Sequence, residues 1–238
     1  YEIVENATKY AKKHQIELIV AIGGGSSIDA AKIIAVCVNS DQSLDSMVCT
    51  NNIDGERLPL IVIPTTAGTG SEVTFVSVLT GTDGSKKAIY SPKIIPDLAL
   101  LDAELALNLP GHITAATALD AMVHAVEAYT SRTKKNVISD ALAVKALDLL
   151  FNNYSKVMDN GHDLAARENM LLGSTLAGMA FVNASVAAVH GLSYPLGARF
   201  HVPHGHSNAL VMGPIFRFNL LEATDLYAEL SRAVMREQ

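Results

Sequence analysis

Hydrophobic and polar positions follow two different periods along the 238-residue chain. The first part contains short apolar runs bounded by glycine and proline, at residues 17–22, 58–64, 74–80 and 94–102. Runs of this length and composition are typical of β-strands. Between them, residues 1–15 and 28–38 place apolar side chains at helical spacing. This alternation predicts an α/β fold with a parallel sheet.

The strand pattern stops at the helix-breaking residues 108–112, Asn-Leu-Pro-Gly-His. Downstream, the segments 117–129, 137–157, 163–183, 185–197 and 207–219 have a helical period and are rich in alanine and leucine. We therefore predict an N-terminal α/β domain over residues 1–108 and an all-α domain over residues 109–238. Both ends of the chain lie inside helical patterns, so we expect a fragment of a longer protein, with the helical domain truncated.

Two local expectations concern the helices of the second domain. Thr114 or Thr117 is expected to cap the helix over residues 117–129, because a threonine hydroxyl can accept from a free backbone N–H. Pro195 is expected to end the helix over residues 185–197, because proline lacks the N–H that continues a helix.

Composition narrows the function classes. With 49% hydrophobic and 18% charged residues, the chain is expected to fold into a globular protein. The net charge of −6, without a long basic cluster, argues against nucleic-acid binding. Cys37 and Cys49 form no Cys-x-x-Cys pattern, which argues against a disulfide framework or thiolate zinc site and fits a cytoplasmic setting. No apolar run reaches the roughly 18 to 20 residues that span a membrane, so no membrane partner is expected.

Carboxylate and imidazole side chains indicate a metal site in the second domain. Asp120 and His124 are four residues apart in a helical segment, so their side chains share one helix face. A solvated aspartate beside a core histidine is the alternative for this pair alone. Further histidines lie at positions 190, 201, 204 and 206, of which His190 precedes a glycine and His204 lies in Pro-His-Gly. One carboxylate with two or three imidazoles suits Fe, Zn, Ni or Mn better than Ca or Mg, but spacing does not select among His201, His204 and His206.

Two segments of the first domain indicate phosphate binding. Residues 23–27, Gly-Gly-Gly-Ser-Ser, lie between a strand and a helix, where glycine allows close approach and the helix N-terminus offers free N–H groups. The segment departs from Gly-x-Gly-x-x-Gly at Ile28, and a purely structural turn is an equal alternative. Residues 65–71, Thr-Thr-Ala-Gly-Thr-Gly-Ser, follow the second strand, at the sheet edge where α/β proteins bind ligands. Asp29 is placed in the first helical turn, where capping and a cofactor contact are equal alternatives.

These motifs together resemble the iron-dependent (group III) alcohol dehydrogenase family. Asp-x-x-x-His, His-Gly-x-x-x-Pro-Leu-Gly, Pro-His-Gly and the two glycine-containing segments occur in the family's order, over nearly the whole chain. The resemblance implies that the metal ligands are Asp120, His124, His190 and His204, with His201 and His206 outside the ligand set. It also implies a set of residues that contact NAD or NADP: Gly24, Gly25, Ser26, Asp29, Thr65, Thr66, Thr69 and Lys87.

The resemblance further implies an oxidoreductase that passes a hydride between a primary or secondary alcohol and NAD(P). The alcohol oxygen would bind the metal, Fe²⁺ with Zn²⁺ as the alternative, and no catalytic residue beyond the metal ligands is expected. Small alcohols or aldehydes are the expected partners, along with self-association into a homo-oligomer. A glycerol dehydrogenase, a maleylacetate reductase and a non-catalytic nucleotide- or metal-binding fragment are the alternatives.

Tyr194 is one departure from this family pattern. It occupies a position at which many relatives carry a histidine. A tyrosine does not titrate near neutral pH, so no proton relay is expected at residue 194.

Overall fold

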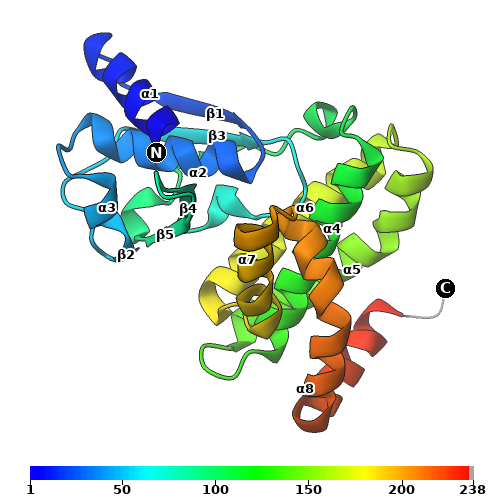
Figure 1. The fold of residues 1–238 in the computed structure, drawn as a ribbon. Helices are drawn as coiled ribbons and strands as arrows, with labels where there is room; N and C mark the ends of the chain where they lie inside the picture. Colours follow the sequence, from blue (N-terminus) through cyan, green and yellow to red (C-terminus); the bar gives the residue numbers. More distant parts are fainter. Residues whose placement is uncertain (236–238) are drawn as a thin grey trace. The chain divides into compact units, whose positions relative to one another are not determined.

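The computed structural model describes residues 1–235, which form two compact units (Figure 1). Unit 1 joins Tyr1–Thr65 to Ser71–Leu101, and unit 2 joins Thr66–Gly70 to the chain from Asp102 onward. The prediction of an N-terminal α/β region followed by an all-helical region is confirmed. The division into domains at residue 109 stays a prediction.

Unit 1 contains two small sheets. The first has the order β1-β3-β6 with parallel pairing, and the second has the order β2-β5-β4, in which β4 and β5 are antiparallel. The elements are α1 (Glu2–Lys13), β1 (Ile19–Gly23), α2 (Gly25–Val38), α3 (Leu44–Met47), β2 (Cys49–Thr50), β3 (Leu60–Pro64), β4 (Val76–Thr80), β5 (Lys86–Tyr90) and β6 (Leu98–Ala99), with 3₁₀ turns at Ser71–Val73 and Pro92–Ile94.

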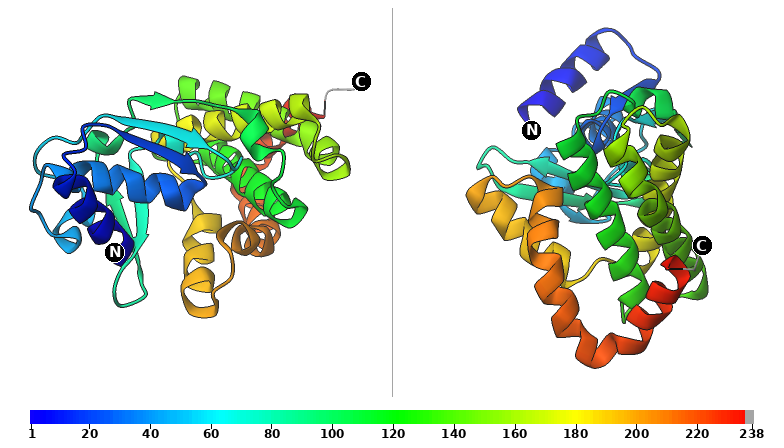
Figure 2. Two further views of the ribbon diagram at one scale, coloured as in Figure 1. Left: turned by 90° about the horizontal axis from the view of Figure 1, so that it is seen from above. Right: turned by 90° about the vertical axis from the view of Figure 1, so that its right-hand side faces the viewer.

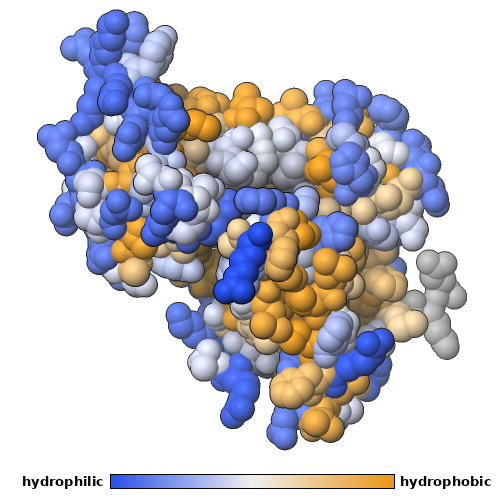
Figure 3. Space-filling view, in the orientation of Figure 1, coloured by the Kyte–Doolittle hydropathy of each residue, from blue (hydrophilic) through white to orange (hydrophobic). Residues whose placement is uncertain are grey.

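Helix α2 provides the core of unit 1. Its residues Ile28 and Ala31 pack with Ala21, Leu60 and Val62 of the parallel sheet. The opposite face of β1 is uncovered, since Val20 and Ile22 are more than half exposed, and Figure 3 shows hydrophobic side chains gathered there. Gly23 pairs with Pro64, so β1 and β3 end at the same edge of the sheet.

Unit 2 is helical throughout its described residues. It consists of a 3₁₀ turn at Ala103–Ala106 and the helices α4 (Gly111–Thr130), α5 (Val137–Asp159), α6 (Leu164–Ala184), α7 (Ala188–Phe200) and α8 (His204–Val234). Helices α4, α5 and α6 lie side by side (Figure 2) and share a core of buried alanines at positions 125, 128, 143, 146, 177 and 180. Small side chains let helix backbones approach closely. Within residues 1–235 no single helix has both the length and the apolar character to cross a membrane; α6 and α7 meet that test only as a pair bent by 105°.

Several predicted element boundaries are wrong. Helix α4 begins at Gly111, after Pro110, so neither Thr114 nor Thr117 caps it, and the Thr117 hydroxyl donates to the Ile113 carbonyl inside the helix. Proline at the start of a helix costs no hydrogen bond, because the first N–H groups have no partner there. The strand expected over residues 94–102 shrinks to Leu98–Ala99, since Pro96 cannot donate to a ladder.

Helix α7 is shifted by three residues from its predicted bounds, and α8 is longer than predicted. Helix α7 continues through Pro195 to Phe200, and α8 begins already at His204. Helix α8 contains Pro214 and kinks at Ala223, where φ is −128°. The two helices pack against each other, and this packing outweighs the single hydrogen bond lost at each proline.

Candidate metal centre

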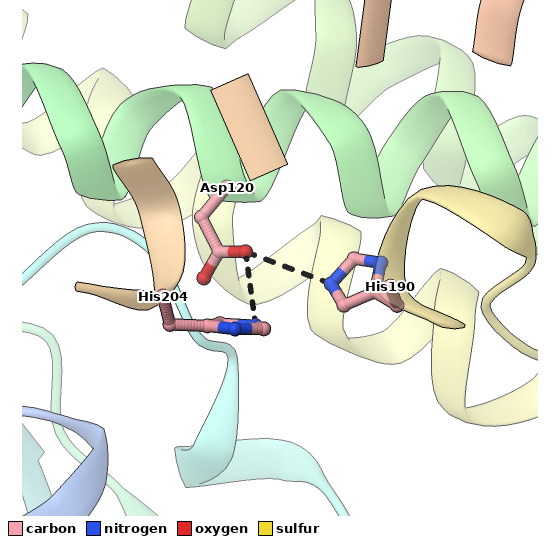
Figure 4. Close-up of side chains that lie close together, drawn as sticks. All are labelled: Asp120, His190 and His204. Carbon is pink, nitrogen blue, oxygen red and sulfur yellow. Dashed lines mark ion pairs between the residues drawn. The ribbon is translucent and has the colours of Figure 1, made fainter. Parts of the chain in front are cut away.

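Three side chains from three helices of unit 2 converge on one point. Asp120 comes from α4, His190 from α7, and His204 is the first residue of α8 (Figure 4). The Oδ1 atom of Asp120 lies 3.6 Å from Nε2 of His190 and 3.6 Å from Nε2 of His204. The three ligand atoms all lie within 4.8 Å of one another. Ligands bonded at about 2.0 to 2.2 Å to one ion stand roughly 3 to 4 Å apart, so this spacing fits a divalent metal.

Close contact between α4 and α8 places His204. A Cβ atom added at Gly205 would overlap the Ala116 carbonyl group of α4, so the first turn of α8 lies directly on α4 only because residue 205 is glycine. The Pro-His-Gly motif therefore has a steric role beside any chemical one: glycine lets the preceding histidine reach Asp120.

His124 adjoins the cluster without belonging to the three-residue set. Its Nε2 lies 4.0 Å from the same oxygen of Asp120. Its ring stacks between Phe181, at 4.3 Å and 20°, and His190, at 4.5 Å and 19°. The Nδ1 atom of His124 is buried without a hydrogen-bond partner. The structure thus brings together Asp120, His190 and His204 and places the fourth predicted ligand beside them.

Burial and mutual charge shift the pKa values of these groups. Burial acts to raise the pKa of Asp120, but the neighbouring imidazoles His124, His190 and His204 bring it well below its ordinary value. For His124, burial together with the charges of the other two histidines lowers the pKa to about 4. For His190, burial opposes a rise, but the neighbouring carboxylates of Asp120 and Glu127 raise the pKa to about 9. Asp120 is therefore an ionised ligand oxygen, buried among imidazoles, that is suited to a cation.

Asn208 completes the cluster and was not predicted. Its buried Nδ2 donates to Oδ1 of Asp120 at 2.5 Å and lies 3.3 Å from Nε2 of His190 and 3.5 Å from Nε2 of His204. The amide oxygen Oδ1 of Asn208 is buried without a partner. The N–H group of Asn208 thus lies where the three ligand atoms converge, and a bound cation would take its place at Oδ1 of Asp120. The signal in the sequence is the spacing, because Asn208 follows His204 by one helical turn.

One side of the cluster is open to solvent. Asp120 and His190 are buried, but the side chain of His204 is 40% exposed. Tyr194 is 43% exposed, and its ring stacks on His204 with centroids 5.5 Å apart and planes at 10°. His201 and His206 are exposed, and His201 ends α7 in a left-handed conformation with φ 55°. The outer side of the cluster is thus formed by the partly exposed side chains of His204 and Tyr194.

Four of the predicted nucleotide residues, Gly24, Gly25, Ser26 and Thr65, share one sheet edge of unit 1. Gly24 is the N-cap of α2, and Gly25 and Ser26 are its first residues. The Thr65 backbone N–H donates to the Gly23 carbonyl at 3.0 Å, so Thr65 lies at the same edge. Gly23 has φ 155°, where an added Cβ would clash with Ser27. This edge offers the free N–H groups of a 14-residue helix beside a threonine hydroxyl, which suits a phosphate.

The other predicted cofactor residues lie elsewhere. Asp29 is the fifth residue of α2, so the capping interpretation is wrong; its carboxylate accepts from the Ser71 hydroxyl at 2.5 Å and the Val78 N–H at 2.9 Å. Lys87 lies in β5 and pairs with Asp83 at 3.2 Å. Thr66 and Thr69 belong to unit 2. The cofactor roles of all these residues stay predictions.

Comparison with known proteins gives a consistent result for both parts of the chain. Residues 1–103 match the family model for iron-containing alcohol dehydrogenases, and residues 114–238 match the C-terminal model of the Fe-containing alcohol dehydrogenase family. The probable alcohol dehydrogenase EutG of Salmonella typhimurium is 41% identical over 222 residues, which are 92% of this chain and 56% of that protein.

Two solved structures extend the comparison. The crystal structure of a 1,3-propanediol oxidoreductase has a TM-score of 0.95 at 34% identity, covering 98% of this chain and 61% of that one. A sulfoacetaldehyde reductase from Bifidobacterium kashiwanohense in complex with NAD⁺ has a TM-score of 0.86 at 32% identity, covering 98% of this chain and 67% of that one. The chain spans somewhat more than half the length of the curated relatives it matches.

Proposed function

Because the chain belongs to the iron-containing alcohol dehydrogenase family, we propose that it interconverts a small alcohol and its aldehyde or ketone with NAD(P), at a divalent metal. The observation that carries this proposal is the convergence of Asp120, His190 and His204, whose ligand atoms lie within 4.8 Å of one another. The chain spans little more than half the length of its curated relatives, so their activity is carried over to it only as a proposal.

We propose Asp120, His124, His190 and His204 as the metal ligands. A bound Fe²⁺ or Zn²⁺ would act as a Lewis acid toward the oxygen of the alcohol or carbonyl group. Fe²⁺ is preferred, because four protein ligands leave a substrate position only when the coordination number exceeds four, whereas structural zinc sites are closed and tetrahedral. Nε2 of His124 lies 4.0 Å from Oδ1 of Asp120, against 3.6 Å for His190 and His204, so His124 is the histidine furthest from this oxygen.

The side chains around the proposed metal differ in their exposure to solvent. Asp120 and His190 are buried, which keeps water from the inner side of the site. The partly exposed His204 and Tyr194 leave the outer side open to a small alcohol. The Tyr194 hydroxyl can donate a hydrogen bond there.

For the nucleotide, we propose that the start of α2 binds the pyrophosphate. Gly24, Gly25 and Ser26 present the free N–H groups of this helix, and Thr65 lies at the same edge. The NAD⁺ complex of the sulfoacetaldehyde reductase supports a nicotinamide nucleotide as the ligand class. Roles for Asp29, Thr66, Thr69 and Lys87 are proposed on the family resemblance alone.

Steady-state turnover tests the proposal. The Fe²⁺- or Zn²⁺-loaded protein is incubated with short primary and secondary alcohols and NAD or NADP, and reduced nucleotide is followed by its absorbance. We expect turnover that His204→Ala abolishes and that His162→Ala leaves unchanged, since His162 is an exposed residue outside the cluster. Binding of metal and nucleotide without turnover of any alcohol would refute the enzyme and favour a binding module.

A further inference from the structure

The buried carboxylate of Glu127 lies on α4, two helical turns beyond Asp120, and is outside the predicted ligand set. Its Oε2 lies 2.6 Å from Nδ1 of His190. On the other side of the same ring, Nε2 of His190 faces Asp120 at 3.6 Å. Glu127 and the metal cluster therefore hold opposite nitrogens of one imidazole.

Glu127 also holds the backbone that carries this ring. Its carboxylate accepts from the N–H of Ala187 at 3.0 Å and from the N–H of Val189 at 2.6 Å. These groups lie at the start of α7, whose N-cap residue Ala187 supplies no side-chain acceptor. A single carboxylate thus caps the helix and contacts the imidazole one residue further along.

The donor and acceptor roles follow from chemistry. A carboxylate that receives three hydrogen bonds is held in its ionised form and can only accept. Nδ1 of His190 must then carry a proton, which leaves Nε2 as the nitrogen that faces Asp120 and His204. A carboxylate partner of this kind fixes the ring orientation of a metal-binding histidine and raises its basicity.

We propose that Glu127 is the positioning residue of the metal centre, fixing both the start of α7 and the protonated Nδ1 of His190 so that Nε2 points into the site. The assignment of His190 as a ligand rests on the proposed function, but the hydrogen bond and the cap do not. His124, which adjoins the cluster, differs from His190 because its Nδ1 is buried without a hydrogen-bond partner.

Zinc affinity of the full chain gives the first test, measured by competition with a chromogenic chelator. Glu127→Gln keeps the size of the side chain but replaces one acceptor oxygen with a donor, so at least one of the three donors loses its partner. We expect about a 10- to 100-fold loss of zinc affinity for Glu127→Gln and a smaller loss for Glu127→Asp.

Ser131→Ala is the matched control. Ser131 is buried at the end of the same helix and donates to the Ala184 carbonyl at 2.6 Å, without contact to the cluster. Denaturant unfolding of both variants measures their loss of stability. Zinc affinity should be unchanged in Ser131→Ala, and an equal affinity loss in both variants would overturn the proposal.

Nitrogen NMR of the histidine rings gives a test that needs no active enzyme and no altered Glu127. In the metal-free and zinc-loaded protein, Nδ1 of His190 should carry a slowly exchanging proton, assigned by its absence in His190→Gln. An unprotonated Nδ1 in the unaltered chain would overturn the proposal. If the unaltered chain binds no zinc, the proposed function fails, and the NMR signal still decides the role of Glu127.

Discussion

The chain contains two His-Gly pairs, and the structure predicts opposite effects for a Gly→Ala substitution in each. Gly191 follows His190 in α7, and an added Cβ there would meet nothing within 4 Å. Gly205 follows His204 in α8, and an added Cβ there would lie 2.6 Å from the Ala116 carbonyl carbon and closer still to its oxygen. Since non-bonded carbon atoms prefer about 3.5 to 4.0 Å, Gly205→Ala must push α8 away from α4 by on the order of 1 Å.

This displacement sets the expected magnitudes. Overpacking of this kind costs about 1 to 3 kcal/mol of unfolding free energy, whereas Gly191→Ala in an open helical position should be neutral or add about 0.5 to 1 kcal/mol. His204 moves with α8, and metal bonds tolerate shifts of only about 0.2 Å, so we expect at least about a 10-fold loss of zinc affinity for Gly205→Ala alone.

Urea unfolding and chelator competition measure these two quantities on the same samples. The reasoning about helix contact would be refuted if Gly205→Ala matched Gly191→Ala in both stability and zinc affinity. A loss of stability in Gly205→Ala with full zinc affinity would show that His204 does not depend on the position of α8.

Three further outcomes follow from particular contacts. Asn208→Ala should destabilise the metal-free protein by about 1 to 3 kcal/mol and the zinc-loaded protein by less, because the metal replaces the lost donor to Asp120; unfolding curves with and without zinc check this. The Arg57 guanidinium lowers the pKa of Asp97 to about 2, below its unfolded value, so this pair stabilises the fold above about pH 4 and the effect is lost as the pH falls toward 2. Because Asp97 is half exposed, this loss of unfolding free energy should stay below about 1 kcal/mol. It should be absent in Asp97→Asn, and acid unfolding of both proteins checks this. Tyr194→Phe should leave the pH dependence of turnover unchanged between roughly pH 6 and 9, and a shifted profile would assign the hydroxyl a proton-transfer role.

Local spacing explains what the sequence could predict. Asp120 and His124 share a helix face because they are four residues apart, and the glycine run of residues 23–27 follows a strand and begins a helix as expected. These features depend on neighbours along the chain, and so they can be read from a single sequence.

Contacts between distant segments could not be predicted. Glu127 and His190 are 63 positions apart, and the path of α5 and α6 between them brings the carboxylate to the imidazole. Asp29 was predicted at a helix start, but it lies a turn inside α2. Its carboxylate accepts hydrogen bonds from Ser71 and Val78, which follow β3 in the chain and fold back onto α2. Neither partner is visible in a local pattern of hydrophobic and polar residues.

The measurement that tests the central claim most directly is the metal content of the anaerobically purified chain, compared with His190→Ala and with His162→Ala as the exposed control. The account predicts about one iron or zinc ion per chain in the unaltered protein and in His162→Ala, and its loss in His190→Ala. No bound metal in the unaltered protein after anaerobic reconstitution with Fe²⁺ or Zn²⁺, or equal metal in all three proteins, would contradict the assignment of Asp120, His190 and His204 as a metal centre.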